Sequence, residues 1–172
     1  MKSFLITIFI LCFSGSLFGQ SEEWKSLEGE SYSILYPSDW ELDQSGLMNT
    51  KFIVFAPQSA NTDKFKENVN LISQDLKGMN VTLDQYVELS VQQIKLMIPK
   101  CKILETETVK TDEIEFHKIL YTGDQGQFNL TFRQYLFLQN ETAFVITFTS
   151  EQSQFENYKE IGEKVLESFV LK

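Results

Sequence analysis

The sequence predicts an α+β protein in which an antiparallel sheet of about six to seven strands is flanked by helices. Three observations point to this class. Several short runs alternate apolar and polar residues, two longer segments repeat apolar residues every three or four positions, and four consecutive strand-like runs are separated by short turns. The helical segments are segregated from the strands along the chain, which is typical of α+β folds.

Composition sets the broad class. The chain has 172 residues, 42% hydrophobic and 23% charged, with 8 Gly and 3 Pro, which excludes collagen-like, low-complexity and disordered classes and fits one domain. It has 15 Lys and Arg against 24 Asp and Glu, a formal net charge of −9. An acidic chain repels phosphate backbones, so we expect no nucleic-acid partner.

Residues 1–19 have the pattern of a secretory signal peptide. Lys2 precedes an apolar run from Phe4 to Phe13, and small residues follow it. This run is about 10 residues long, whereas a membrane-spanning helix needs roughly 20. We expect cleavage after Gly19, export to the periplasm or the exterior, and no membrane span afterwards; a retained anchor is the alternative. Cys12 lies inside the apolar run and follows a leucine, which argues against a lipid-modified cysteine.

Residues 20–31 are mostly polar and predict a lead-in with room for one edge strand, before a single domain over residues 32–172. Three strands are predicted first in this domain, and prolines follow two of them. They cover residues 32–36, 51–56 and 68–76. A polar loop is expected over residues 58–66.

Residues 82–98 predict the clearest helix. Thr82 and Gln85 match a capping box, and Pro99 ends the segment. Its apolar residues recur at helical steps, which predicts one buried face. They are Leu83, Val87, Val91, Ile94 and Ile98.

Four strands and a second helix complete the prediction. Short turns between the strands favour an antiparallel meander, and the alternation of apolar residues in the last two strands predicts one strongly buried face. The strands cover residues 102–109, 114–122, 127–138 and 142–149, and the turn between the second and third covers residues 123–126. The helix covers residues 154–169, with Ser153 and Glu156 as its capping-box pattern.

This order of elements resembles the PsbP-like family. Tyr36, Pro37 and Trp40 form a Tyr-Pro-x-x-Trp turn after the first strand of the domain, and the Phe-rich meander and terminal helix follow. The resemblance covers about residues 32–171 and implies an α/β/α sandwich around an antiparallel sheet. Its named members include an extrinsic subunit of photosystem II, and most bacterial secreted members have no assigned activity. No functional residue carries over, and we expect no cofactor. The composition and the Gly19–Gln20 junction also resemble secreted proteins of the Bacteroidetes group of Gram-negative bacteria.

Catalytic motifs are absent from the sequence. It has no G-x-S-x-G, no Gly-rich phosphate loop and no His-based zinc motif. Cys101 and His117 form the Cys–His pair available to a mature chain, and Cys101 follows a predicted helix end, where the helix dipole disfavours a thiolate. We therefore expect no catalytic residues.

Four residues are candidates for a metal site. Glu105 and Glu107 share one face of a predicted strand, and Glu115 and His117 share one face of the next. If Glu107 pairs with Glu115, the four side chains form one acidic patch that suits Ca²⁺ or Mn²⁺. A register shifted by one residue separates them. A charged, solvent-exposed face is the favoured alternative, so we expect no metal.

Four further residues are candidates for contact with a partner or ligand. Arg133 is the one Arg of the chain and points away from the Phe-rich face of its strand, so it can anchor a carboxylate or pair with a Glu on a covering helix. Trp24, Tyr36 and Trp40 cluster near the amino end, where an exposed aromatic patch would mark a contact surface, and core packing is the favoured alternative.

Together these observations favour an exported, non-enzymatic domain that docks onto an envelope protein or assembly. The alternative is a small-ligand or lipid-binding module with a pocket between sheet and helix, lined by Phe and Met. A hydrolase is the third possibility, and it would have to use His117.

Overall fold

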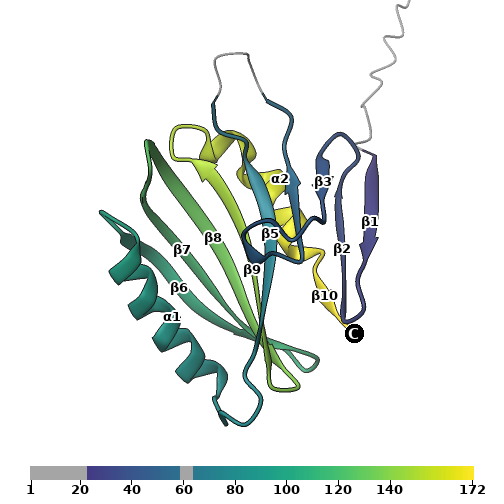
Figure 1. Ribbon diagram of the computed structural model, residues 1–172, viewed down its shortest axis with the longest axis vertical. Coiled ribbons are helices and arrows are strands. Elements are labelled where there is room, and N and C mark those ends of the chain that lie inside the picture. Colours follow the sequence, from purple (N-terminus) through teal and green to yellow (C-terminus); the bar gives the residue numbers. More distant parts are fainter. Residues whose placement is uncertain (1–22, 59–63) are drawn as a thin grey trace, which may run out of the picture.

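The computed structural model describes residues 23–58 and 64–172, and it confirms the α+β class. The predicted signal peptide and its cleavage site lie outside these ranges. In the described part, every paired strand is antiparallel, and the strands form one seven-stranded and one three-stranded sheet (Figure 1). No helix among the described residues is long and apolar enough to cross a membrane.

The larger sheet has the strand order β3-β4-β5-β9-β8-β7-β6. Its strands are β3 (Glu41–Asp43), β4 (Phe52–Phe55), β5 (Asn68–Asp75), β6 (Lys102–Lys110), β7 (Glu115–Gln125), β8 (Phe128–Gln139) and β9 (Thr142–Glu151). The smaller sheet has the order β1-β2-β10 and consists of β1 (Trp24–Glu28), β2 (Tyr32–Pro37) and β10 (Val170–Leu171). The helices are α1 (Leu83–Met97), α2 (Phe155–Glu167) and the short 3-10 helix η1 (Leu47–Asn49).

Most predicted elements are present, with a few differences at their ends. The lead-in contributes β1, which pairs with β2, while β3 and β10 were not predicted. The turn expected over residues 123–126 is wrong, because β7 continues to Gln125 and the chain reverses at Gly126, whose φ is +61°. Part of the predicted polar loop at 58–66 falls outside the described residues.

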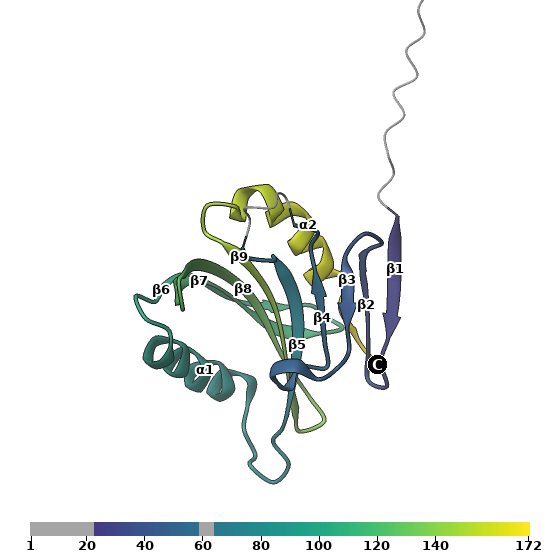
Figure 2. The ribbon, with the colours of Figure 1, turned by 45° about the horizontal axis from the view of Figure 1, so that its top comes forward.

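Because side chains alternate along the strands of the larger sheet, they form two hydrophobic clusters, one on each face. In β8, Tyr135 and Phe137 join the larger cluster, whereas Leu130, Phe132 and Leu136 join the smaller one. Figure 2 shows α2 and α1 on opposite sides of this sheet. The expectation of one strongly buried face was therefore incomplete, because both faces carry buried apolar side chains.

Helix α2 packs tightly on its face. Phe155, Val165 and Leu166 are buried, and Gly162 lies directly over the ring of Phe148. The capping box expected from Ser153 and Glu156 does not form, because Gln154 is the N-cap residue and makes no side-chain capping bond.

Helix α1 packs more loosely. Its capping box is formed as predicted, with Gln85 N 3.3 Å from Thr82 Oγ1 and Thr82 N 3.0 Å from Gln85 Oε1. Yet no residue of α1 is buried, and its apolar stripe is only half-buried against β7 and β8. At its C-terminal end the chain approaches β7 where Gly123 leaves room for Ile98. The helix therefore covers only part of the sheet face on which it lies.

The strand β6 is one of the two edge strands of the larger sheet, opposite β3. Seven of its nine residues are exposed, including Lys102, Glu105, Glu107 and Lys110. Its pairing with β7 shifts register between Ile103 and Glu105, which indicates a β-bulge.

Substitution of Gly162 tests the packing of α2. A Cβ there would lie 2.7 Å from the Phe148 ring, so Gly162→Ala should destabilise the fold by about 1–2 kcal/mol despite the better helix propensity of Ala. Urea unfolding measures the difference. Glu160→Ala, at an exposed position of the same helix, should stay within about 0.5 kcal/mol, and equal stability of Gly162→Ala and the natural chain would contradict the packing argument.

Candidate functional site

A large hollow lies on the sheet face that α1 leaves open. We call it the trough; its volume is about 560 Å³. It is lined by residues from η1, β4, β5, β7, β8 and β9, together with Thr50, Phe65 and Gly126. Because η1 and β4 lie at one end of the sheet and α1 covers β7 and β8 at the other, the trough spans the middle strands.

Uncharged polar side chains form the floor of the trough. Strand pairing sets Asn68 opposite Thr149 and Asn70 opposite Thr147, and Gln134 lies across from Thr147 on the other side. These side chains bond to one another, with Gln134 Nε2 donating to Thr147 Oγ1 at 3.1 Å and Asn70 Nδ2 donating to Asn68 Oδ1 at 3.4 Å. The floor is therefore a compact set of amides and hydroxyls at the centre of the sheet.

Apolar side chains form the two walls. On the wall nearer α1, Tyr121 and Phe132 stack with centroids 4.7 Å apart, and Phe65 contacts Phe128 at 5.2 Å. Burial raises the pKa of Tyr121 well above its ordinary value, so its phenol is neutral at physiological pH. The opposite wall is formed by Leu47, Met48, Ile53, Phe55 and Ile72.

Exposure differs along the second wall. Ile53 is buried, whereas Leu47 and Met48 are 51% and 71% exposed. Met48 and Asn49 have positive φ values of 56° and 63°, in the left-handed region that non-glycine residues seldom adopt. The rim of the trough at η1 thus presents large apolar side chains to solvent.

No charged residue is found among the eighteen trough-lining residues that the structure describes. This contrasts with the whole chain, in which 23% of residues are charged. The trough can hold a ligand by apolar contact and neutral hydrogen bonds, and its lining provides no acid–base pair for catalysis.

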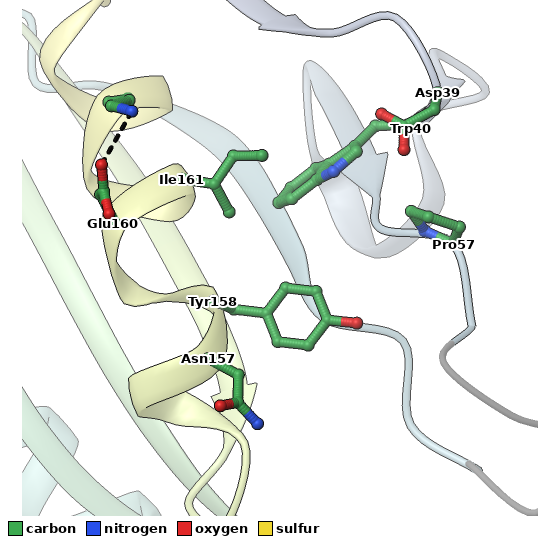
Figure 3. Close-up of a pocket in the computed structure, with 8 residues that line it drawn as sticks. Asp39, Trp40, Pro57, Asn157, Tyr158, Glu160 and Ile161 are labelled. Carbon is green, nitrogen blue, oxygen red and sulfur yellow. Dashed lines mark ion pairs between the residues drawn. The ribbon is translucent and has the colours of Figure 1, made fainter. Parts of the chain in front are cut away.

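A second hollow of about 320 Å³ lies between α2 and the turn that follows β2 (Figure 3). Trp40 and Ile161 point toward one another across it, and Tyr158 projects from α2 toward the segment at Pro57. Its rim is charged, with Lys164 Nζ 3.0 Å from Glu160 Oε1. It is smaller than the trough, and mixed in charge.

The three aromatic candidates at the amino end pack into the core and do not form an exposed contact patch. Tyr36 and Trp40 are buried, at 6% and 4% exposure, and Trp24 is half-buried against the same cluster. The cause is the inward face of β2 and the turn after it, which pack against α2 and complete the larger core.

The four metal candidates are separated by the hairpin register. Glu107 pairs with Lys118 and Glu115 with Lys110, so Glu105 and Glu107 lie on the α2 face while Glu115 and His117 lie on the α1 face. Glu105 binds Arg133, and Glu115 Oε2 lies 3.0 Å from Lys110 Nζ. Across the described ranges, no group of three or more His, Cys, Asp or Glu side chains could hold a metal ion.

His117 and Cys101 are far apart. His117 is buried between two hydroxyls, with Thr106 Oγ1 2.7 Å from its Nε2 and Thr108 Oγ1 2.8 Å from its Nδ1. Cys101 lies beside Gly123, six residues along β7 from His117, or about 20 Å at the rise of a strand. Burial raises the pKa of the Cys101 thiol. The two do not form a catalytic pair.

Arg133 takes the structural role that the sequence left open. Its Nη1 lies 2.7 Å from Glu105 Oε2 and its Nη2 lies 3.1 Å from Glu163 Oε1 of α2. The side chain is 10% exposed, and its Nε is buried without a partner among the described residues. The guanidinium thus ties β6 and α2 to the centre of the sheet.

The sequence reasoning missed the floor of the trough. In the strand predicted at 142–149, Phe144, Ile146 and Phe148 marked the core face, which left Thr147 and Thr149 as outward residues. The sequence carries no signal for this floor, because the position of β9 between β5 and β8 is known only from the strand pairing. Thr147 and Thr149 are each 6% exposed, so this sheet face is only partly open to solvent.

Comparison with known proteins matches this architecture. The sequence pattern of the family described as PsbP-like protein matches residues 17–171. Among proteins with curated descriptions, none matches the chain.

Three solved structures are similar in fold. Protein PA94 from Pseudomonas aeruginosa, of unknown function, shares 11% identity, covering 87% of this chain and 97% of that chain with a TM-score of 0.63. Cyanobacterial PsbP (CyanoP) from Synechocystis sp. PCC 6803 shares 14% identity, covering 92% and 99% with a TM-score of 0.62. LpqN from Mycobacterium tuberculosis, described as involved in cell envelope biogenesis, shares 8% identity, covering 87% and 91% with a TM-score of 0.61. At these identities the likeness shows the fold alone.

The burial of His117 predicts a pH-dependent stability. Desolvation lowers the pKa of His117, and Asp84 only partly opposes this, so the folded chain binds the proton less tightly than the unfolded chain, where the pKa is about 6.5. The free energy of unfolding should therefore be highest above about pH 6.5 and should fall as the pH drops through the folded-state pKa. Urea unfolding at a series of pH values measures this. His117→Gln should flatten the profile near pH 6, and an unchanged profile would contradict the assignment.

The role of Arg133 is tested by Arg133→Lys. A single ammonium cannot bridge Glu105 and Glu163 as the guanidinium does, so the free energy of unfolding should fall by roughly 1–2 kcal/mol. Lys110→Gln, in an exposed ion pair, serves as control and should change it by less than about 0.5 kcal/mol. If Arg133 served only to contact a partner, Arg133→Lys would leave unfolding unchanged.

Proposed function

The chain belongs to the PsbP-like protein family, and from that premise we propose that it is an exported, non-catalytic binding module whose ligand lies in the trough. The observation that carries the proposal is the incomplete cover of the sheet by α1. The trough over the uncovered part of that face has a volume of about 560 Å³, which is within the range of small-molecule sites. It combines apolar walls with a few polar groups.

The chemistry of the described residues supports a binding role over a catalytic one. Catalysis by acid–base or nucleophilic routes needs a titratable group beside its partner. The trough contains one titratable side chain in its described lining, Tyr121, and the raised pKa keeps that phenol protonated. His117 is enclosed by Thr106 and Thr108 and does not line the trough.

Export is supported by the amino-terminal pattern of residues 1–19. A solved structure of similar fold, LpqN, is described as involved in cell envelope biogenesis. We place the mature protein in the periplasm or outside the cell on these grounds.

A second candidate function is docking onto an envelope protein. The observation that favours it is the solvent face of α1, where Leu89, Leu96 and Met97 are 58%, 87% and 65% exposed. Large apolar side chains in such numbers on one helix are typical of contact surfaces. The two functions are separable, because none of these three residues lines the trough.

Filling the trough tests the first function. Asn70→Trp places a large ring on the floor, and we expect it to weaken binding of the uncharged dye Nile red by at least about tenfold, measured by its fluorescence. Asn157→Trp, beside the second hollow, is the matched control and should leave dye binding unchanged. Circular dichroism checks that both variants fold. No dye binding to the natural chain, or loss of binding only in the control, would overturn the proposal.

A further inference from the structure

We propose that the trough selects an uncharged amphiphile, meaning an alkyl chain that carries hydroxyl or amide groups and no ionised group. The inference deepens the proposed function and rests on it, because it names the chemical class of the trough's ligand.

The exclusion of charge comes from the lining. An ionised group held in the trough would lose water without gaining an opposite charge, since none of the described lining residues is charged. Lys66 comes near the rim, with its Nζ 5.8 Å from the centre of the Phe55 ring, but that ammonium lies 3.0 Å from Glu41 Oε2. The net charge of −9 further disfavours anions.

The requirement for hydroxyl or amide groups comes from the floor. Asn68, Asn70 and Gln134 carry amides, and Thr147 and Thr149 carry hydroxyls, so each side chain both donates and accepts hydrogen bonds. A hydroxyl or amide on the ligand also does both and can satisfy such a floor in more than one orientation. A purely apolar ligand would exclude water from the donor and acceptor positions that these side chains do not use among themselves.

The dimensions favour a narrow polar head with one alkyl chain. The floor occupies mainly β5 and β9, two neighbouring strands about 5 Å apart, and the walls begin one strand further out at Ile53 and Phe132. The polar strip is therefore one small head group wide. An alkyl chain leaving it contacts Leu130 and Phe132 on one wall or Ile53 on the other.

The test compares three amphiphiles that share a twelve-carbon chain and differ in charge. The protein is used as the full chain in the form that accumulates in the cell. It is titrated by calorimetry at about pH 7.5, where laurate is ionised. The three amphiphiles are monolauroylglycerol, laurate and dodecylammonium, each below its micelle concentration. We expect monolauroylglycerol to bind at least about tenfold more tightly than either charged amphiphile.

A charge placed in the floor should invert this order. Asn70→Asp adds one carboxylate at nearly constant side-chain volume. We expect it to weaken the binding of monolauroylglycerol by at least about fivefold and to strengthen the binding of dodecylammonium. Asn157→Asp adds the same charge at the second hollow and should leave all three affinities unchanged. If Asn70→Asp does not fold, the panel on the natural chain still decides.

The outcomes separate the two proposals. Laurate or dodecylammonium binding as tightly as monolauroylglycerol overturns the inference and leaves the binding function standing. If Nile red binds and monolauroylglycerol does not, the inference is also overturned while the binding function stands. Absence of binding by the dye and by all three amphiphiles overturns the proposed function together with the inference.

Discussion

The alternation of side chains along β8 and β9 determines both the apolar core under α2 and the polar floor of the trough. Both strands lie in the interior of the sheet, so each residue has to serve one of two faces. Phe144, Ile146 and Phe148 are buried on the α2 side, and that choice sends Val145, Thr147 and Thr149 to the α1 side. The apolar core and the polar floor of the trough thus follow from one periodicity.

The two helices then cover these faces unequally. Helix α2 sits close because Gly162 accepts the Phe148 ring and Arg133 reaches Glu163 from beneath. Helix α1 begins with a complete capping box and yet buries no residue. Its stability comes from local capping and a half-buried stripe, which is enough to hold a helix on β7 and β8 but leaves the middle strands open. This difference in cover is what makes a binding surface possible without a loop insertion.

Much of the fold could be predicted from the sequence, and the parts that could not have physical reasons. The helix that begins after Thr82 and the Phe-rich meander are long enough for the spacing of their apolar residues to identify them as helix and strands. In contrast, β3 and β10 have three and two residues, too few to show a period. The register that separates Glu105 from His117 is set by the turn between Lys110 and Glu115, which alternation does not encode. The polar floor of the trough could not be predicted, because alternation shows that Asn70 and Thr147 face away from the main core but not that a hollow lies over them.

The edge strand β6 has a consequence for how neighbouring molecules of this protein interact. An unpaired strand offers its main chain to any other strand it meets and invites sheet-to-sheet aggregation. Here that edge carries lysines at both ends and two glutamates between them, and its bulge increases the local twist. Pairing with another strand would force these charges together or strip them of water. The charges and the bulge of β6 therefore disfavour pairing of this edge with a strand of a neighbouring molecule.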